Sequence, residues 1–315
     1  METVKTHVVL VADLKDKLPS RVRRIVLHDN LLVGPCREAF EEHIAERTAY
    51  LRAQGEQNVR TAYIHLANAM TTSHELVVWS CDAWPQHVAL AMICSLRLRQ
   101  PNSPRISVIE LALRAQSTGT CCGVPAVPTT VAEMRALIPR NLTDSDLLQF
   151  SSVWARFVAR DPARFLGTGS GVISNADALR ALYEKLFPRR RFGVLHLSRF
   201  DELLLSAARE SLTPADLVVG KSTELVMLRR WVSCAGDSFV ARRLWDWSEH
   251  PSGAPALLAD PMDRSGSMFR MRYSLTATGR SMLDDRLQRF EDAPVLRVGG
   301  TAAYDPAWPY EIEDQ

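Results

Sequence analysis

Short apolar runs recur through the first third of this chain, at His7–Ala12, Arg24–Leu27, Leu76–Trp79 and Ile106–Leu111. Each run is continuous rather than alternating, which is typical of a strand that is buried on both faces. Between them, residues 37–52 and 85–99 carry apolar side chains at three- and four-residue spacing, a pattern that predicts amphipathic helices. Strands that alternate with helices favour a mainly parallel sheet, so we expect an α/β fold.

The pattern changes after about residue 112. Residues 119–128 are rich in glycine and proline and predict a loop. Helix-capping sequences, in which a Thr or Ser side chain accepts from N–H groups of the first turn, then occur at Thr130–Glu133, Thr143–Asp146 and Ser174–Asp177. We therefore predict a Rossmann-like domain over residues 1–115 and a helical middle region over residues 116–192.

The last third of the chain has the element order of a winged helix. Helices are predicted over residues 198–210, from Thr213 onward and over residues 237–249, and strand-like runs follow at Ala256–Ala259 and Phe269–Leu275. Three helices followed by a two-stranded hairpin make up that motif. We predict a winged-helix-like domain over residues 193–315, ending in a tail whose aromatic residues fold back onto the protein.

Composition excludes several classes of protein. The chain has 38 Lys and Arg against 36 Asp and Glu, so it lacks the strong positive field of a protein that coats nucleic acid. Its 6 cysteines show no Cys-x-x-Cys spacing, which argues against a metal site. The N-terminus lacks the pattern of a secretory signal, and no run approaches the roughly 20 apolar residues of a membrane span. We expect a cytoplasmic protein without membrane contact, and these patterns identify no cofactor.

Polar side chains follow three of the predicted strands directly. In an open parallel sheet, ligands bind outside the carboxyl ends of the strands, where loops and helix N-termini offer free N–H groups. The residues at these ends are Asp13 after the first strand, His28, Asp29, Asn30 and Gly34 after the second, and Ser80, Asp82, Gln86 and His87 after the third. If these loops meet, carboxylates and imidazoles that are far apart in the chain become neighbours in space.

Two functions fit this arrangement. The leading hypothesis is a protein that binds a small polar or nucleotide-like ligand, with the ligand-binding candidates Asp13, Asn30, Gly34, Ser80 and Gln86. The alternative is a hydrolase or group transferase, because carboxylates beside imidazoles suit acid–base catalysis, with the catalytic candidates His28, Asp29, Asp82 and His87. A purely structural interpretation also exists, in which the aspartates cap helices and Gly34 turns the chain.

The predicted winged helix carries arginines where that motif meets nucleic acid. The candidates for phosphate contact lie on the third predicted helix and in the predicted wing, and are Arg242, Arg243, Arg270 and Arg272. The same helix also contains acidic and aromatic residues that suit a surface packed against protein, namely Trp245, Asp246, Trp247 and Glu249. DNA and a protein partner are therefore both candidates for this module.

Several landmarks follow one another along the chain. The apolar run at His7–Ala12 is followed by a turn at His28–Pro35 and by a run that ends in Trp79 ahead of Asp82. Later landmarks are Ser198–Glu202, Ala235–Phe239, Ser274–Arg280 and Val298–Gly300. This order resembles the bacterial DUF1835 domain family, whose members are uncharacterised. The resemblance covers most of the chain and implies a shared architecture but no activity.

Overall fold

The computed structural model divides the chain into two compact units. The first consists of residues 1–176 with 299–301, and the second of residues 177–298 with 302–315. The division therefore falls near residue 176, rather than at residues 115 and 192. The residues that the structure describes are 4–11, 14–19, 21–27, 29–32, 34–52, 59–81, 84–100, 103–114, 124–125, 127–128, 130–159, 185–191, 194–213, 237–249, 255–263, 268–284, 293–304 and 312–313.

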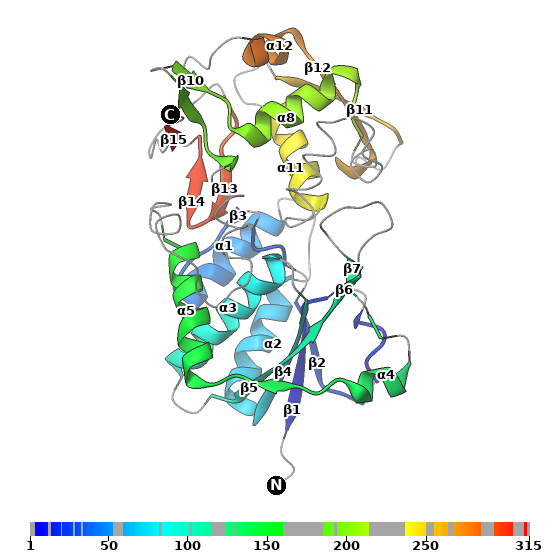
Figure 1. Cartoon of the computed structure of the whole chain (residues 1–315), viewed down its shortest axis with the longest axis vertical. Coiled ribbons are helices and arrows are strands. Elements are labelled where there is room, and N and C mark those ends of the chain that lie inside the picture. Colours follow the sequence, from blue (N-terminus) through cyan, green and yellow to red (C-terminus); the bar gives the residue numbers. More distant parts are fainter. Residues whose placement is uncertain are drawn as a thin grey trace. The chain divides into compact units, whose positions relative to one another are not determined.

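A five-stranded sheet, in the order β2-β1-β4-β5-β8, forms the centre of the first unit (Figure 1). Its strands are β1 (Lys5–Val9), β2 (Arg24–Val26), β4 (Glu75–Cys81), β5 (Arg105–Leu111) and β8 (Arg140–Asn141). The strands β2, β1, β4 and β5 run parallel, and β8 is antiparallel to β5. The mainly parallel α/β sheet predicted from the apolar runs is confirmed. The strand order reverses at β1, which has β2 on one side and β4 on the other.

Three short strands in the first unit had no signal in the sequence. They are β3 (Gly34–Pro35), β6 (Leu113–Arg114) and β7 (Val124–Pro125), of which β6 and β7 form an antiparallel pair. The strand β8 was also not predicted, and it interrupts the region that was expected to be helical. It has only two residues, both exposed. Two residues are too few to show an apolar periodicity, so the sequence alone cannot reveal such a strand. It is recognised only by its pairing with β5.

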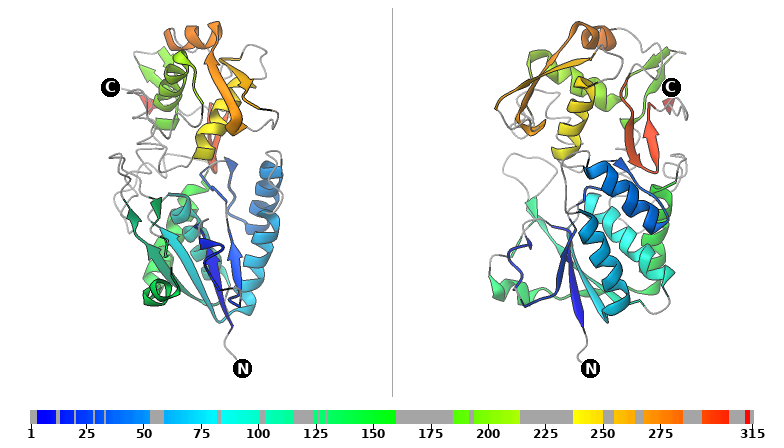
Figure 2. Two further views of the ribbon diagram at one scale, coloured as in Figure 1. Left: turned by 90° about the vertical axis from the view of Figure 1, so that its right-hand side faces the viewer. Right: turned by 180° about the vertical axis from the view of Figure 1, so that it is seen from behind.

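Helices cover one face of the sheet and a shorter layer covers the other. The helices α1 (Phe40–Arg52), α2 (Val59–Thr72), α3 (Trp84–Arg99) and α5 (Asp144–Phe157) lie together on one side, while α4 (Val131–Ala136) lies on the opposite side (Figures 1 and 2). On the α4 side, Val77, Trp79 and Ile109 pack with Leu14 and Leu18, which lie in the segment after β1. Coverage on both faces explains the continuous apolar runs, since a strand between two layers has no polar side.

Two helix starts match their capping sequences. Thr130 caps α4 and Thr143 caps α5, and in each case the side chain accepts from the backbone N–H three residues later. The predicted helices at 37–52 and 85–99 correspond to α1 and α3. Helix α2 was not predicted, although its buried Tyr63, Leu66 and Met70 have helical spacing.

The first unit is completed by a short segment from near the end of the chain. The Cys36 N–H donates to the Gly299 carbonyl at 2.7 Å, and the Gly300 N–H donates to the Phe157 carbonyl at 3.0 Å. A Cβ atom at Gly300 would lie 1.8 Å from the Val158 carbonyl oxygen, and Gly299 has a φ of +62°. This close backbone approach therefore requires glycine.

The second unit contains two helices and a hairpin that the sequence predicted. Its elements are β9 (Arg189–Arg191), β10 (Val194–His196), α8 (Arg199–Ala207), the 3-10 turn η2 (Ala208–Glu210), α11 (Asp237–Ser248), β11 (Leu257–Pro261), η3 (Met268–Arg270), β12 (Met271–Leu275), α12 (Ala277–Asp284) and β15 (Ile312–Glu313). The strands β13 (Leu296–Gly299) and β14 (Thr301–Ala303) also belong to it, except for Gly299 and Thr301, which belong to the first unit. The helices predicted at 198–210 and 237–249 are confirmed. Strands β11 and β12 pair antiparallel, as expected for the hairpin. The helix predicted from Thr213 onward lies outside the described residues.

The hairpin of the second unit is extended by one more backbone contact. Leu212 and Tyr273 form an isolated antiparallel bridge, with a hydrogen bond of 2.8 Å in each direction. Gly279, near the start of α12, packs so closely that a Cβ there would lie 2.3 Å from the Ala256 carbonyl oxygen. Among the residues that the structure describes, no helix is long and apolar enough to cross a membrane.

Candidate functional site

A pocket of about 240 Å³ opens at the carboxyl edge of the sheet in the first unit. Its lining residues follow β1 and β2 or belong to the first two turns of α3, and are Leu10, Leu27, Asp29, Asn30, Pro85, Gln86 and Ala89. The pocket lies where the strand order reverses, which is the position at which open parallel sheets bind ligands. Its volume is slightly below the roughly 300–1,000 Å³ of pockets that enclose drug-sized ligands.

Asp29 contributes to the pocket wall while its carboxylate is buried behind that wall. Arg47 donates from Nε to Asp29 Oδ2 at 3.0 Å and from Nη2 to Asp29 Oδ1. Nη2 also donates to the Asn30 carbonyl at 3.2 Å. Both side chains of the ion pair have no exposed surface. Burial acts to lower the pKa of Arg47, but the adjacent Asp29 carboxylate outweighs burial and raises the pKa, so the guanidinium stays charged.

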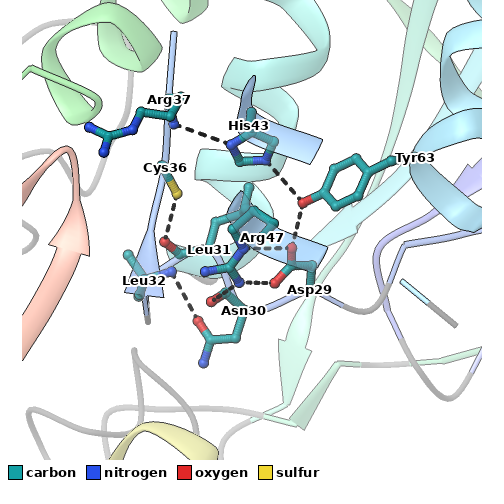
Figure 3. Close-up of polar contacts among 9 residues, drawn as sticks. All are labelled: Asp29, Asn30, Leu31, Leu32, Cys36, Arg37, His43, Arg47 and Tyr63. Atoms are coloured by element: carbon teal, nitrogen blue, oxygen red, sulfur yellow. Dashed lines mark hydrogen bonds and ion pairs between the residues drawn. The ribbon is translucent and has the colours of Figure 1, made fainter. Parts of the chain in front are cut away.

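A chain of hydrogen bonds continues from this ion pair into α1 and α2 (Figure 3). The Tyr63 hydroxyl donates to Asp29 Oδ2, and His43 Nε2 lies 3.2 Å from the same hydroxyl oxygen. On the other side of the imidazole, the Arg37 backbone N–H donates to His43 Nδ1 at 3.4 Å. A backbone N–H can only donate, so Nδ1 is the acceptor and a neutral His43 carries its proton on Nε2. In this series of hydrogen bonds, each donated proton therefore points toward Asp29.

Burial keeps the neighbours of the ion pair neutral. It lowers the pKa of His43 to about 4, and the positive charge of Arg47 acts in the same direction. Burial also raises the pKa of Tyr63 well above its ordinary value, and the Asp29 carboxylate raises it further. The Cys36 thiol, whose Sγ donates to the Leu31 carbonyl at 3.5 Å, has its pKa raised by burial to about 12. The network is thus one ion pair surrounded by uncharged groups at neutral pH.

Gln86 is a polar side chain supplied to the pocket by α3. Its Nε2 donates to the Leu10 carbonyl at 3.4 Å, which is long for a hydrogen bond of this kind. Its Oε1 is buried and has no hydrogen-bond partner among the described residues. A buried acceptor without a partner is uncommon and unfavourable, so the amide of Gln86 is held only weakly in this position.

The structure brings three of the predicted site residues together, and these are Asp29, Asn30 and Gln86. Gly34, Ser80 and His87 do not line the pocket. Ser80 is buried and its hydroxyl lies 3.4 Å from the Cys81 carbonyl. Gly34 has a φ of +84°, and a Cβ there would lie 2.3 Å from the Tyr50 ring, so its role is close packing against α1. Asp13, His28 and Asp82 lie outside the described residues.

The catalytic role predicted for Asp29 needs correction. A general base must be able to reach the proton that it removes from the substrate. The Asp29 side chain has no exposed surface, and its oxygens accept from Arg47 and Tyr63. The carboxylate therefore acts as an internal anchor for the wall of the pocket. His87 lies half-buried in α3.

Sequence reasoning missed the residues that hold this wall in place. His43 and Arg47 are four residues apart in α1, and both are fully buried. An arginine on the same helical face as buried positions signals a buried acidic partner, because arginine is rarely buried without one. The sequence does not say which acid that is, since Asp29 and Arg47 are brought together only by the packing of α1 beside the end of β2.

The phosphate contact predicted for Arg243 in the second unit is also wrong. Arg243 is fully buried, and its guanidinium donates to both Asp201 oxygens at 2.7 and 2.9 Å. Trp247 donates from Nε1 to the same carboxylate at 2.8 Å, so this face of α11 belongs to the core. Arg242 pairs with Asp246 one helical turn away, and both side chains are partly buried. The two arginines of the predicted wing, Arg270 and Arg272, are exposed.

No group of three or more His, Cys, Asp or Glu side chains is positioned to hold a metal ion within the described part of the chain. Comparison of the chain with protein-family models, with curated proteins and with solved structures gives no match. The functional argument for this protein therefore depends on the pocket and the network behind it.

Proposed function

We propose that this protein binds a small polar ligand in the pocket at the carboxyl edge of its parallel sheet. The observation that carries the proposal is the position of the pocket, between the residues after β1 and β2 and the first turns of α3. Strand ends on the two sides of a reversal in strand order diverge, which leaves space for a ligand in the crevice between their loops.

The buried network supports a binding role because it fixes one wall of the pocket before any ligand arrives. Asp29 is held by Arg47 and Tyr63, and Arg47 also holds the Asn30 carbonyl. The Asn30 side chain in turn accepts from the Leu32 N–H at 3.2 Å. A wall that is ordered in advance reduces the entropy that binding would otherwise cost.

A thermal-shift screen against small polar metabolites tests the proposal, with nucleobases, nucleosides, amino acids, sugars and sugar phosphates as probes. Ala89→Leu places a larger side chain in the pocket, whereas Ala91→Leu enlarges a buried alanine of the same helix that does not line it. We expect a probe to raise the melting temperature of the wild type and of Ala91→Leu, but not of Ala89→Leu. A shift that persists in Ala89→Leu would place binding elsewhere and refute the proposal.

We also propose the finer fold assignments. The parallel order β2-β1-β4-β5 supports a Rossmann-like first unit. The bridge between Leu212 and Tyr273 supports a winged-helix-like second unit, because it adds a third strand position to the β11–β12 hairpin. Membership of the DUF1835 domain family is proposed on the sequence landmarks alone.

Contact between the second unit and DNA or a protein stays a prediction. Arg242, Arg270 and Arg272 are its remaining phosphate-contact candidates after the loss of Arg243. A gel mobility-shift assay at two salt concentrations tests it, because phosphate contacts weaken as salt rises. Retention that is absent at both concentrations would remove DNA as a partner. The hydrolase or transferase alternative likewise stays a prediction, since His28 and Asp82 lie outside the described residues.

A further inference from the structure

The described walls of the pocket favour an uncharged occupant. Four of the seven lining residues that the structure describes are apolar. The charge of Asp29 is buried behind the wall and neutralised by Arg47. An ion placed against these residues would lose its hydration without gaining a charged partner from them. A neutral molecule with a flat apolar body avoids that cost and gains contact with the apolar walls.

The amide of Gln86 is suited to bind a ligand edge on which a donor stands beside an acceptor. In its present position Gln86 makes one long bond to Leu10, and its Oε1 has no partner among the described residues. If the amide turned into the pocket, it would therefore lose only this one long hydrogen bond to the Leu10 carbonyl. There it could accept from a ligand N–H through Oε1 and donate through Nε2 to a neighbouring acceptor. Glutamine and asparagine bind adenine in this two-bond manner when proteins recognise bases in DNA.

The size of the pocket limits the occupant further. The pocket volume of about 240 Å³ lies below the roughly 300–1,000 Å³ of pockets that hold drug-sized ligands. It accommodates a one- or two-ring heterocycle better than a nucleotide, whose ribose and phosphate would extend beyond the walls.

We propose that the pocket binds an uncharged nitrogen heterocycle of nucleobase size, with Gln86 as the residue that hydrogen-bonds its donor–acceptor edge. This inference rests on the proposed function and makes it specific. It concerns the class of ligand and the residue that selects it, and it gives the phosphate group no part in binding.

Isothermal titration calorimetry with free adenine and free cytosine tests the inference on the full chain. We expect at least one of them to bind the wild type, and Gln86→Leu to weaken it by about tenfold or more, as the loss of a two-bond contact to a base does. Gln100→Leu is the matched control, because Gln100 also has a buried Oε1 with no partner in the described part of the chain but does not line the pocket. Binding to this control should stay within about twofold of the wild type.

Two further measurements keep the test independent of how the variants fold. Gln86→Met serves as a second substitution if Gln86→Leu fails to fold, which circular dichroism shows. On the wild type alone, unsubstituted purine lacks the amino donor of adenine, so we expect it to bind about tenfold more weakly than adenine.

The outcomes separate this inference from the function on which it rests. Equal binding of a base by the wild type and both Gln86 variants would overturn the role of Gln86. If AMP or inorganic phosphate binds, loses binding in Ala89→Leu, and the free bases do not bind, then the heterocycle is wrong and the pocket function stands. If neither the bases nor the wider panel of probes binds, both proposals fail.

Discussion

Among the residues that the structure describes, two arginines, Arg47 in the first unit and Arg243 in the second, are completely buried. Each donates through two nitrogens to an aspartate that is equally buried. Each guanidinium also lies over an aromatic ring, at 5.4 Å from the Tyr50 centroid and 5.2 Å from the Trp247 centroid. A buried ion pair gives little net stability compared with apolar residues, but removing one member leaves a buried charge without its partner. These pairs therefore fix which side chains pack together.

Substitution of Arg47 tests this at the pocket. Arg47→Met leaves the Asp29 carboxylate buried and unpaired, so we expect the free energy of unfolding to fall by about 3–5 kcal/mol in urea denaturation. The double variant Asp29→Leu/Arg47→Met removes both charges and should recover part of the loss. Arg99→Met, which breaks an exposed pair with Glu38, should cost less than about 1 kcal/mol. A double variant that is less stable than either single variant would contradict this account.

His43 predicts a dependence of stability on pH. Its pKa is about 4 in the folded protein, against an ordinary value of 6.5 for a solvated histidine, so the unfolded chain takes up a proton first as pH falls. The contribution of the neutral His43 side chain to the free energy of unfolding is fully present above pH 6.5, and it is lost as the pH falls toward 4. Between pH 7 and pH 4.5 we expect a loss of about 2–3 kcal/mol from this group.

The measurement is urea denaturation of the wild type and of His43→Gln at several pH values. Glutamine can accept from Arg37 and donate to Tyr63 without titrating in this range. The charged and titratable groups that face His43, namely Arg47, Asp29 and Tyr63, are the same in both proteins, so the difference in slope isolates the imidazole. Parallel slopes for the two proteins would rule out the buried neutral histidine.

At the scale of elements, α4 and α5 begin at threonines whose side chains satisfy backbone N–H groups. The Thr130 hydroxyl accepts from the Glu133 N–H at 3.1 Å, and the Thr143 hydroxyl accepts from the Asp146 N–H at 3.2 Å. In return, the Glu133 and Asp146 carboxylates accept from the two threonine N–H groups. Both bonds of each cap are local in the chain, which is why the sequence predicted these two helix starts.

Removal of either cap should lower stability by a modest amount. We expect Thr130→Ala and Thr143→Ala each to reduce the free energy of unfolding by about 0.5–2 kcal/mol. Thr71→Ala is the control, because the exposed Thr71 hydroxyl caps no helix and donates to the Asn68 carbonyl of its own helix. Its effect should stay within about 0.5 kcal/mol. If the two cap variants lost no more stability than this control, packing alone would determine where these helices begin.

The elements that the sequence predicted correctly are those whose signal lies within the element itself. The strand β4 has an unbroken apolar run, and α5 has both a cap and an apolar face. The strand β8 has neither, and it is defined by its antiparallel pairing with Ser107 and Val108 on β5. The candidate site divides in the same way. Asn30 and Gln86 were found from their places after strands, whereas Arg47 and Tyr63 join the site only through the packing of α1 and α2.

At the scale of the whole molecule, each of the two units has its own core and its own buried ion pair. The pair in the second unit links α8 to α11 and is reinforced by Arg243 Nη1, which donates to the Pro294 carbonyl at 2.6 Å. The Asp29 pair lies entirely in the first unit. The loss of one pair should therefore be felt mainly in the unit that contains it.

Hydrogen exchange measured by mass spectrometry tests this separation. Arg243→Met leaves Asp201 buried and unpaired, so we expect amide protection to fall in α8 and α11. Protection in β4 and α3 of the first unit should remain close to that of the wild type. An equal loss of protection in β4 and α3 would mean that the two units unfold as one cooperative structure.

The contribution of residues 299–301 to the first unit has a consequence for how the protein is made. A ribosome delivers the chain from its N-terminus at about 5–20 residues per second, so residues 177–298 take roughly 6–24 s to emerge. Throughout that interval the Phe157 carbonyl and the Cys36 N–H lack the glycine backbone that they bind in the finished protein. The nascent first unit can collapse early, but its hydrogen bonds to Gly299 and Gly300 form only after those residues have emerged.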